Sequence, residues 1–169
     1  MFRHIADFKT IWQQEVEHTL HVFDAIPDAA AHQAVGPEHR NLRRIAWHLV
    51  ETCVEMPHNM GLKIEGFKGE PFKTQPPPTM KEIRDAYAAV SGSVLAEVEK
   101  LNAMALAMDY PFYGMTWTGA FALYVLVTHQ THHRGQMTVL MRQAGLKVPG
   151  TYGPAKEEWG AFGKETPAV

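Results

Sequence analysis

Two histidines four residues apart, His129 and His133, are the residues in this sequence best placed to do chemistry. On an α-helix, residues at this spacing project from one face, one turn above the other. Two imidazoles arranged in this way suit a single divalent metal ion. Spacing alone leaves a second interpretation open, in which the two rings are hydrogen-bonded residues of a protein core. A metal site would also require a third ligand from elsewhere in the chain.

The helical face around His129 is largely apolar. At about 100° per residue, the positions within roughly 60° of His129 form the expected core face. These positions are Ala122, Val125, Leu126, Gln136 and Leu140. His133 lies about 40° from His129, inside this face, whereas His132 lies about 60° away in the other direction. We therefore expect His129 and His133 to point inward and His132 to lie at the rim.

A second amphipathic segment offers the third ligand. His48 lies at the edge of an apolar stripe centred near Leu49 and Met56. The polar residues that share this edge are Thr52, Glu55 and Asn59. Such an edge is either the wall of a site or a solvated flank of the helix, and the pattern by itself favours the flank. Glu55 is the candidate catalytic residue on this face, where it would accept a proton or orient a ligand, or else be a solvated carboxylate.

Four amphipathic segments must position these residues. Apolar residues recur at three- and four-residue steps over approximately 4–25, 41–62 and 79–107, and in a fourth segment that begins at Thr116 or Thr118 and ends at Gly145. Asn41 and Thr79 are predicted N-caps, the latter in a capping box with Glu82, and Gly145 is a predicted C′ glycine. Pro57 should kink or break the second segment. Four such segments predict an all-α, four-helix bundle, an architecture that builds metal sites from facing helices.

The remaining stretches predict loops. Residues 63–78 hold two glycines and four prolines without any period, which predicts a long loop between the second and third helices. Such a loop could cover the site. Residues 109–114 predict a turn, and no stretch alternates with a period of two, so no strand is expected. We expect the segment after Gly145 to pack back on the bundle through Tyr152 and Trp159.

Composition limits the class of protein. The chain has 169 residues, of which 46% are hydrophobic and 20% charged, enough for one domain that buries roughly 70% of its unfolded surface. The formal net charge is −2 without a long basic run, which argues against nucleic acid as a partner. No apolar stretch reaches 18 residues and none resembles a signal peptide, so we expect no membrane span and a cytoplasmic location. The single cysteine, Cys53, forbids an intramolecular disulfide and is expected to be a small buried hydrophobe.

The stretches around the three histidines resemble the DinB-like (DinB/YfiT) superfamily. The run from His129 to Gln136 is similar to its H-x-x-x-H-R-G-Q motif, and residues 140–146 are similar to the L-x-R-x-x-G helix end that follows. Residues 47–51, Trp-His-Leu-Val-Glu, resemble its first histidine motif. The pair at 116–117 and the Tyr-Gly-Pro at 152–154 also fit. In organisation the resemblance spans residues 4–155.

This resemblance implies one DinB-like four-helix bundle domain over residues 1–169 and a divalent ion held by His48, His129 and His133. Three neutral imidazoles would leave a coordination position open, as in catalytic sites. Imidazole ligation suits zinc or nickel, which we expect first, and also iron or copper. A zinc ion could lower the pKa of bound water to about 7, or it could activate a thiolate.

The resemblance also implies a metal-dependent enzyme, either a thiol S-transferase that uses a low-molecular-weight thiol or a hydrolase, with a homodimer as the expected assembly. The sequence does not choose between the two reactions. The alternative function is a non-catalytic, metal-stabilised helical bundle used for binding or stress sensing, because no compelling general base is evident.

Several side chains near the motif have two interpretations each. Arg134 would steer an anionic substrate or form a surface ion pair. Gln136 would bond a ligand or satisfy a polar group in the core, and Gly135 is expected to permit close helix packing. Trp12 and Trp117 would wall a pocket, although core packing is the better interpretation of each.

Overall fold

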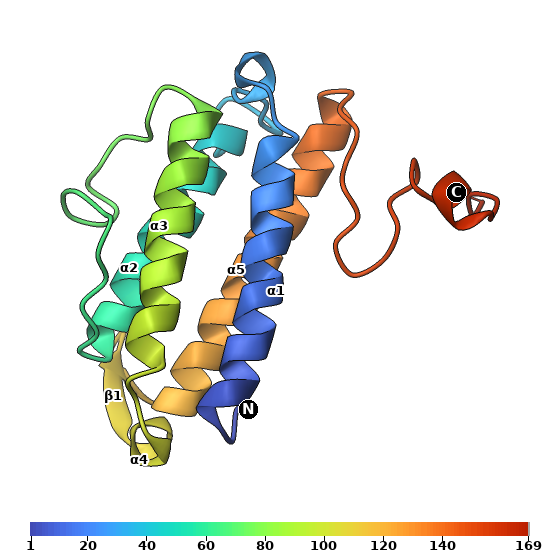
Figure 1. Ribbon diagram of the computed structural model, residues 1–169. Coiled ribbons are helices and arrows are strands. Elements are labelled where there is room, and N and C mark those ends of the chain that lie inside the picture. The colour runs from blue at the N-terminus through green and yellow to red at the C-terminus, as the bar shows by residue number, and fades with distance from the viewer. Residues whose placement is uncertain (169) are drawn as a thin grey trace.

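Four long helices contribute most of the buried apolar side chains of the computed structural model, which describes residues 1–168 (Figure 1). They are α1 (Ile5–Asp24), α2 (Leu42–Asn59), α3 (Met80–Val98) and α5 (Gly119–Gln143). The predicted all-α four-helix bundle is confirmed, and the last residue of the expected 1–169 domain lies outside the described residues. Within residues 1–168, no helix combines the length and the apolar character that crossing a membrane requires.

Helices α2 and α3 run in the same direction, which explains the long loop between them (Figure 1). The Arg43 guanidinium, at the start of α2, donates to the carbonyl of Pro78, just before α3, at 3.3 Å. A parallel pair needs a connection that travels back along the bundle, and 18 helical residues span about 27 Å. Residues 60–79 make that return outside the bundle (Figure 1). The loop predicted over residues 63–78 therefore lies within this connection.

The predicted helix ends follow from local hydrogen bonds. The Asn41 side chain accepts from the backbone N–H of Arg44 at 2.9 Å, and Thr79 and Glu82 form the expected capping box. Gly145 has φ 73°, a left-handed conformation that glycine adopts without steric cost and that ends the helix in a Schellman motif. Helix α2 continues through Pro57 and ends at Asn59, three residues before the expected end.

Two expectations about residues 79–118 are wrong. Helix α3 ends at Val98, and Asn102 caps a separate short helix, α4 (Ala103–Ala107). The predicted turn and the following residues form an antiparallel hairpin of β1 (Asp109–Phe112) and β2 (Met115–Thr118). Strands of four residues are too short to show a period of two, and Pro111 masks the first of them. The hairpin leads directly into α5, whose N-cap is Thr118.

Tyr152 and Trp159, after α5, were both predicted to pack on the bundle, and Tyr152 is the one that contacts it. The Tyr152 hydroxyl bonds to Glu15 on α1 and to Arg134 on α5. Trp159 instead lies on the short helix η2 (Trp159–Phe162), which stands away from the four helices (Figure 1). Another 3₁₀ turn, η1 (Asp28–Ala30), lies between α1 and α2.

Candidate metal centre

The three histidines come together where α2 crosses α5. His48 projects from α2 toward His129 and His133 on α5, with ring centroids 5.2 Å and 4.7 Å from theirs. One ring nitrogen from each residue lies within 4.8 Å of the other two. The structure thus brings together the three residues that the family resemblance implied, from positions about 80 residues apart in the chain.

The spacing of the ring nitrogens fits a shared divalent ion. The Nε2 atoms of His129 and His133 are 3.2 Å apart. Two Zn–N bonds of about 2.0–2.1 Å in tetrahedral geometry would separate their nitrogens by about 3.3–3.4 Å. The observed separation agrees with this value to about 0.2 Å, which is the deviation in distance expected of a plausible metal site.

All three imidazoles are held in the neutral form that a metal ligand needs. Burial lowers the pKa of His48 to about 3 and that of His129 to about 4. The pKa of His133 is also lowered, chiefly by burial. The neighbouring imidazoles and the positive charge of Arg40 contribute smaller effects in the same direction. Neutral rings keep a lone pair for coordination.

Gln136 orients one of the three candidate ligands, His133. Its side-chain oxygen lies 2.7 Å from His133 Nδ1, so the ring N–H donates there and the Nε2 lone pair is left facing His129. Its amide nitrogen lies 3.1 Å from Nε2 of His132. The expectation that Gln136 belongs to the core is wrong, because the residue is exposed at the rim of the site. His132 is exposed there as well, as predicted.

Two buried nitrogens have unmet bonding capacity. Among residues 1–168, Nδ1 of His48 and Nδ1 of His129 lack any hydrogen-bond partner. A buried polar atom without a partner costs roughly 1–3 kcal/mol, so two such rings would be a poor choice for a purely structural core. The donor set, its spacing and its protonation therefore fit a divalent ion.

The long loop covers the His48 side of the site. The Phe72 ring packs 5.6 Å from the His48 ring, measured between centroids. Phe72 has φ 66°, a conformation that is uncommon for a bulky residue and that persists only when the surroundings enforce it. The expectation that this loop lies over the site is consistent with these contacts.

Glu51 is the residue that fixes this loop, and sequence reasoning missed it. Its carboxylate is 0% exposed and accepts from the backbone N–H of Phe72 at 2.9 Å and from the Thr74 hydroxyl at 3.2 Å. The Arg44 guanidinium donates to the same carboxylate at 2.6 Å. The two-turn spacing of Arg44 and Glu51 on α2 was the only signal available, and it does not identify the loop as the third partner.

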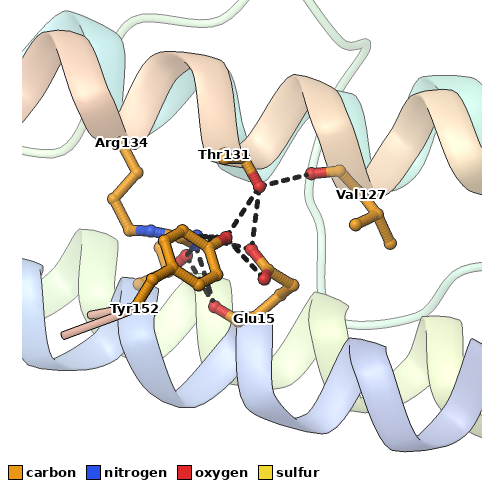
Figure 2. A network of polar contacts seen from close by, with 6 residues as sticks. Glu15, Val127, Thr131, Arg134 and Tyr152 are labelled. Atoms are coloured by element: carbon orange, nitrogen blue, oxygen red, sulfur yellow. Dashed lines mark hydrogen bonds and ion pairs between the residues drawn. The ribbon is translucent and has the colours of Figure 1, made fainter.

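Arg134 lies in the core, contrary to both interpretations offered from the sequence. It is 2% exposed and pairs with Glu15 on α1, itself 4% exposed, at 2.5 Å. Figure 2 shows this pair with the hydroxyls of Thr131 and Tyr152, which lie 3.0 Å and 2.6 Å from the Glu15 carboxylate. Burial raises the pKa of Glu15, but the hydrogen bonds from Tyr152 and Arg134 outweigh it and leave the pKa lowered.

This network shows why the expected core face of α5 was rotated. The buried positions centre near Gln130, about 100° around the helix from His129. Neither Gln130 nor Arg134 looks like a core residue by type, so the apolar pattern placed the centre of the face too close to His129. His129 and His133 are half-buried and lie at the edge of the face that meets α2.

Glu55 makes other contacts and does not join the histidines. Its carboxylate accepts from the Asn59 amide at 3.0 Å and from the Tyr113 hydroxyl at 2.8 Å. It lies seven residues after His48, or about 10 Å along the helix axis. A catalytic role for Glu55 stays a prediction.

The remaining candidates have structural positions. Trp12 is fully buried and donates to the carbonyl of Ser91 at 3.0 Å, which confirms core packing. Trp117 is half-buried on the hairpin and stacks on Phe112. Cys53 is buried as expected, and burial raises the pKa of its thiol.

A cavity of about 400 Å³ opens beside the histidines. Of the three histidines, His133 forms part of its wall, together with Gln136, which bonds the His133 ring. Ligand pockets typically measure about 300–1,000 Å³. The remaining lining residues are Val35, His39, Arg40, Ile45, Val139 and Leu140.

The fold and the site together place the protein in one class, the four-helix bundles with a three-histidine group between two facing helices and a cavity beside it. The chain matches the model of the DinB family over residues 1–166, and it belongs to that family. The uncharacterized protein YrdA of Bacillus subtilis is 37% identical over 171 residues, with both chains covered completely.

Two solved structures are similar. A DinB-like protein from Bacillus cereus is 36% identical and superposes with a TM-score of 0.83 over 90% of this chain and 100% of its own. A second DinB-like protein, YjoA from Bacillus subtilis, shares the fold with a TM-score of 0.65 at 16% identity, over 82% of this chain and 92% of its own.

Proposed function

We propose that the three histidines hold a divalent metal ion, zinc or nickel, and that the protein is a metal-dependent enzyme acting on a small molecule. One observation carries the proposal: three neutral imidazoles converge on one point, with two Nε2 atoms 3.2 Å apart, beside a cavity. Three protein ligands leave room for a substrate group, as in catalytic rather than structural zinc sites.

Of the two expected reactions, the side chains present favour thiol transfer over hydrolysis. A divalent ion bound there would lower the pKa of a thiol or a water molecule that reaches it. Within residues 1–168, the metal-ligating group includes no carboxylate, and Glu55 is bonded to Asn59 and Tyr113. Hydrolysis of an ester or amide also needs a group to protonate the leaving atom, whereas sulfur attack on an electrophilic carbon can release its proton to solvent as the leaving group departs with the bonding pair.

Metal content tests the ligand assignment. Purified wild-type protein should contain close to one equivalent of metal, and His129→Ala should lose it. The matched control is His132→Ala, which removes an exposed imidazole three residues along the same helix and should keep the metal. Equal metal content in the two variants would refute the assignment of His129 as a ligand.

Activity assays then separate the two reactions. Conjugation of a low-molecular-weight thiol to an electrophile and hydrolysis of alkyl esters and amides, whose leaving groups must be protonated, should be measured with the same enzyme, before and after chelation. We expect chelator-sensitive conjugation. In the same assays, Glu55→Gln should retain conjugation and reduce hydrolysis if Glu55 is an acid or base.

The second candidate is a non-catalytic bundle stabilised by the ion, favoured by the absence of a carboxylate beside the histidines in the described residues. A structural ion should be required for folding, so chelation should lower the melting temperature strongly. A catalytic ion in a bundle with this core should leave the fold largely intact. Sedimentation of the purified protein would test the homodimer, which remains a proposal.

A further inference from the structure

The cavity beside the histidines carries an asymmetric set of side chains. Four apolar residues contribute to its wall: Val35, Ile45, Val139 and Leu140. Arg40 is one of the two basic side chains of the 31–41 connection that reach the cavity. Such a mixture suits a ligand with an apolar part and a single charged group.

The Arg40 guanidinium has its donors available. Over residues 1–168 its side chain takes part in no hydrogen bond or ion pair, and Glu38 in the same connection neither pairs with it nor lines the cavity. A guanidinium presents its donors in a planar fork that matches a carboxylate. Arg40 also directly precedes the N-cap of α2, where the positive end of the helix dipole adds to its charge.

The backbone around Arg40 argues for a carboxylate rather than a phosphate. Phosphate sites at helix N-termini use free backbone N–H groups as donors. Here the first N–H groups of α2 are already bonded: Leu42 donates to Gln33, Arg43 to Ala31 and Arg44 to the Asn41 side chain. One guanidinium without backbone donors suits a singly charged carboxylate better than a phosphate dianion.

We infer that the cavity binds the substrate of the candidate metal centre, and that this substrate is an organic carboxylate whose charged group pairs with Arg40. Its apolar part lies against Ile45 and Leu140, and its reacting end reaches His133. That the bound molecule is a substrate rests on the proposed function, whereas the carboxylate site itself depends only on the cavity and on Arg40.

Binding of matched probes tests the inference. The probe is 4-phenylbutyrate and its neutral partner is 4-phenylbutyramide, each titrated into the purified protein and followed by backbone amide shifts of residues 35–45 and 133–140. We expect the carboxylate to bind roughly fivefold more tightly than the amide, the factor that corresponds to a solvent-exposed charge pair of about 1 kcal/mol. Arg40→Ala should abolish that difference, and Arg40→Lys should retain part of it.

A control variant, Arg3→Ala, and a control probe, 3-phenylpropylphosphonate, are measured in the same way. Arg3→Ala removes an exposed arginine before α1 and should change nothing. A carboxylate that simply ligated the metal would bind equally well to wild type and Arg40→Ala, so that outcome refutes the inference. Equal affinity for acid and amide, no saturable binding, or tighter binding of 3-phenylpropylphosphonate than of the carboxylate would refute it as well.

Metal content measured on the same samples separates the two proposals. Arg40-dependent carboxylate binding in protein that never acquires metal would refute the proposed function and leave the carboxylate site standing. Normal metal content with no preference for the carboxylate would refute the carboxylate site and leave the proposed function standing.

Discussion

Replacing Arg134 by Leu should destabilise the protein strongly. The substitution removes the guanidinium that pairs with Glu15 and that donates to the Thr19 hydroxyl at 3.0 Å and to the Tyr152 hydroxyl at 2.5 Å. Glu15 is 4% exposed and cannot be rehydrated in place. Removal of one partner of a buried ion pair costs about 3–5 kcal/mol because the other charge is left without compensation.

The size of the effect can be measured by urea unfolding and by calorimetry. For a chain of this length, about 2–4 °C of melting temperature corresponds to each kcal/mol, so Arg134→Leu should melt roughly 10 °C below wild type. The control lies on the same helix: Arg142 pairs with Glu157 while 40% exposed. Solvent-exposed pairs contribute about 0–1 kcal/mol, so Arg142→Leu should stay within about 3 °C of wild type.

A double variant distinguishes burial of the charge from loss of packing. Removing both charges with Glu15→Leu and Arg134→Leu should recover much of the stability, because no uncompensated charge remains. If Arg134→Leu is no worse than Arg142→Leu, the reasoning from burial is refuted. If the double variant is as unstable as the sum of the single ones, the ion pair is not the origin of the loss.

Three further changes test other parts of the site. Gln136→Ala should weaken metal affinity about 10- to 100-fold by releasing His133 Nδ1, as is typical for partners of metal-bound histidines. The control is Gln143→Ala, which removes an exposed glutamine on the same helix and should leave the affinity unchanged. Equal affinities of the two variants in a competition assay with a chelating dye would contradict this role. The folded-state pKa of Glu15 is lowered, so the contribution of its carboxylate to folding stability is complete above the unfolded-state pKa near 4.5 and is lost as the pH falls through the folded-state value. The stability difference between wild type and Glu15→Gln should therefore shrink below pH 4.5. A difference that grows there would show that the pKa is shifted in the opposite direction. Gly135→Ala should raise stability by up to about 1 kcal/mol in urea unfolding, because a Cβ there meets no atom within 4 Å in the interior of a helix; destabilisation would mean that a partner covers this position.

Apolar periodicity was enough to predict four helices and most of their ends. The Asn41 and Thr79 caps and the Gly145 stop depend on local hydrogen bonds between residues close in the chain, which a sequence displays directly. The hairpin was missed because its two strands are held by each other and not by a pattern within either strand. The break after Val98 was missed because apolar residues continue through it.

The site was predictable only in part, and for a different reason. Helical spacing paired His129 with His133, but the choice of His48 came from the family resemblance, since its own helix placed it at a polar edge. Long-range contacts such as those of Glu51 with Thr74 have no local signature. Nothing in the sequence marks Arg40 as a binding residue, because an exposed arginine before an N-cap becomes a candidate only when a cavity is found beside it.

The four residues from His133 to Gln136 have different structural roles, although the family motif groups them together. His133 faces α2 and the candidate metal, and the next residue, Arg134, faces α1 and its buried carboxylate. Successive residues on a helix point about 100° apart, so this pair fixes α5 against both neighbours at the same height. Gly135 contributes no close packing, contrary to expectation, and Gln136 returns to the site to hold the His133 ring. The ion pair between α1 and α5 therefore helps to hold α5 in the rotation that places His129 and His133 opposite His48.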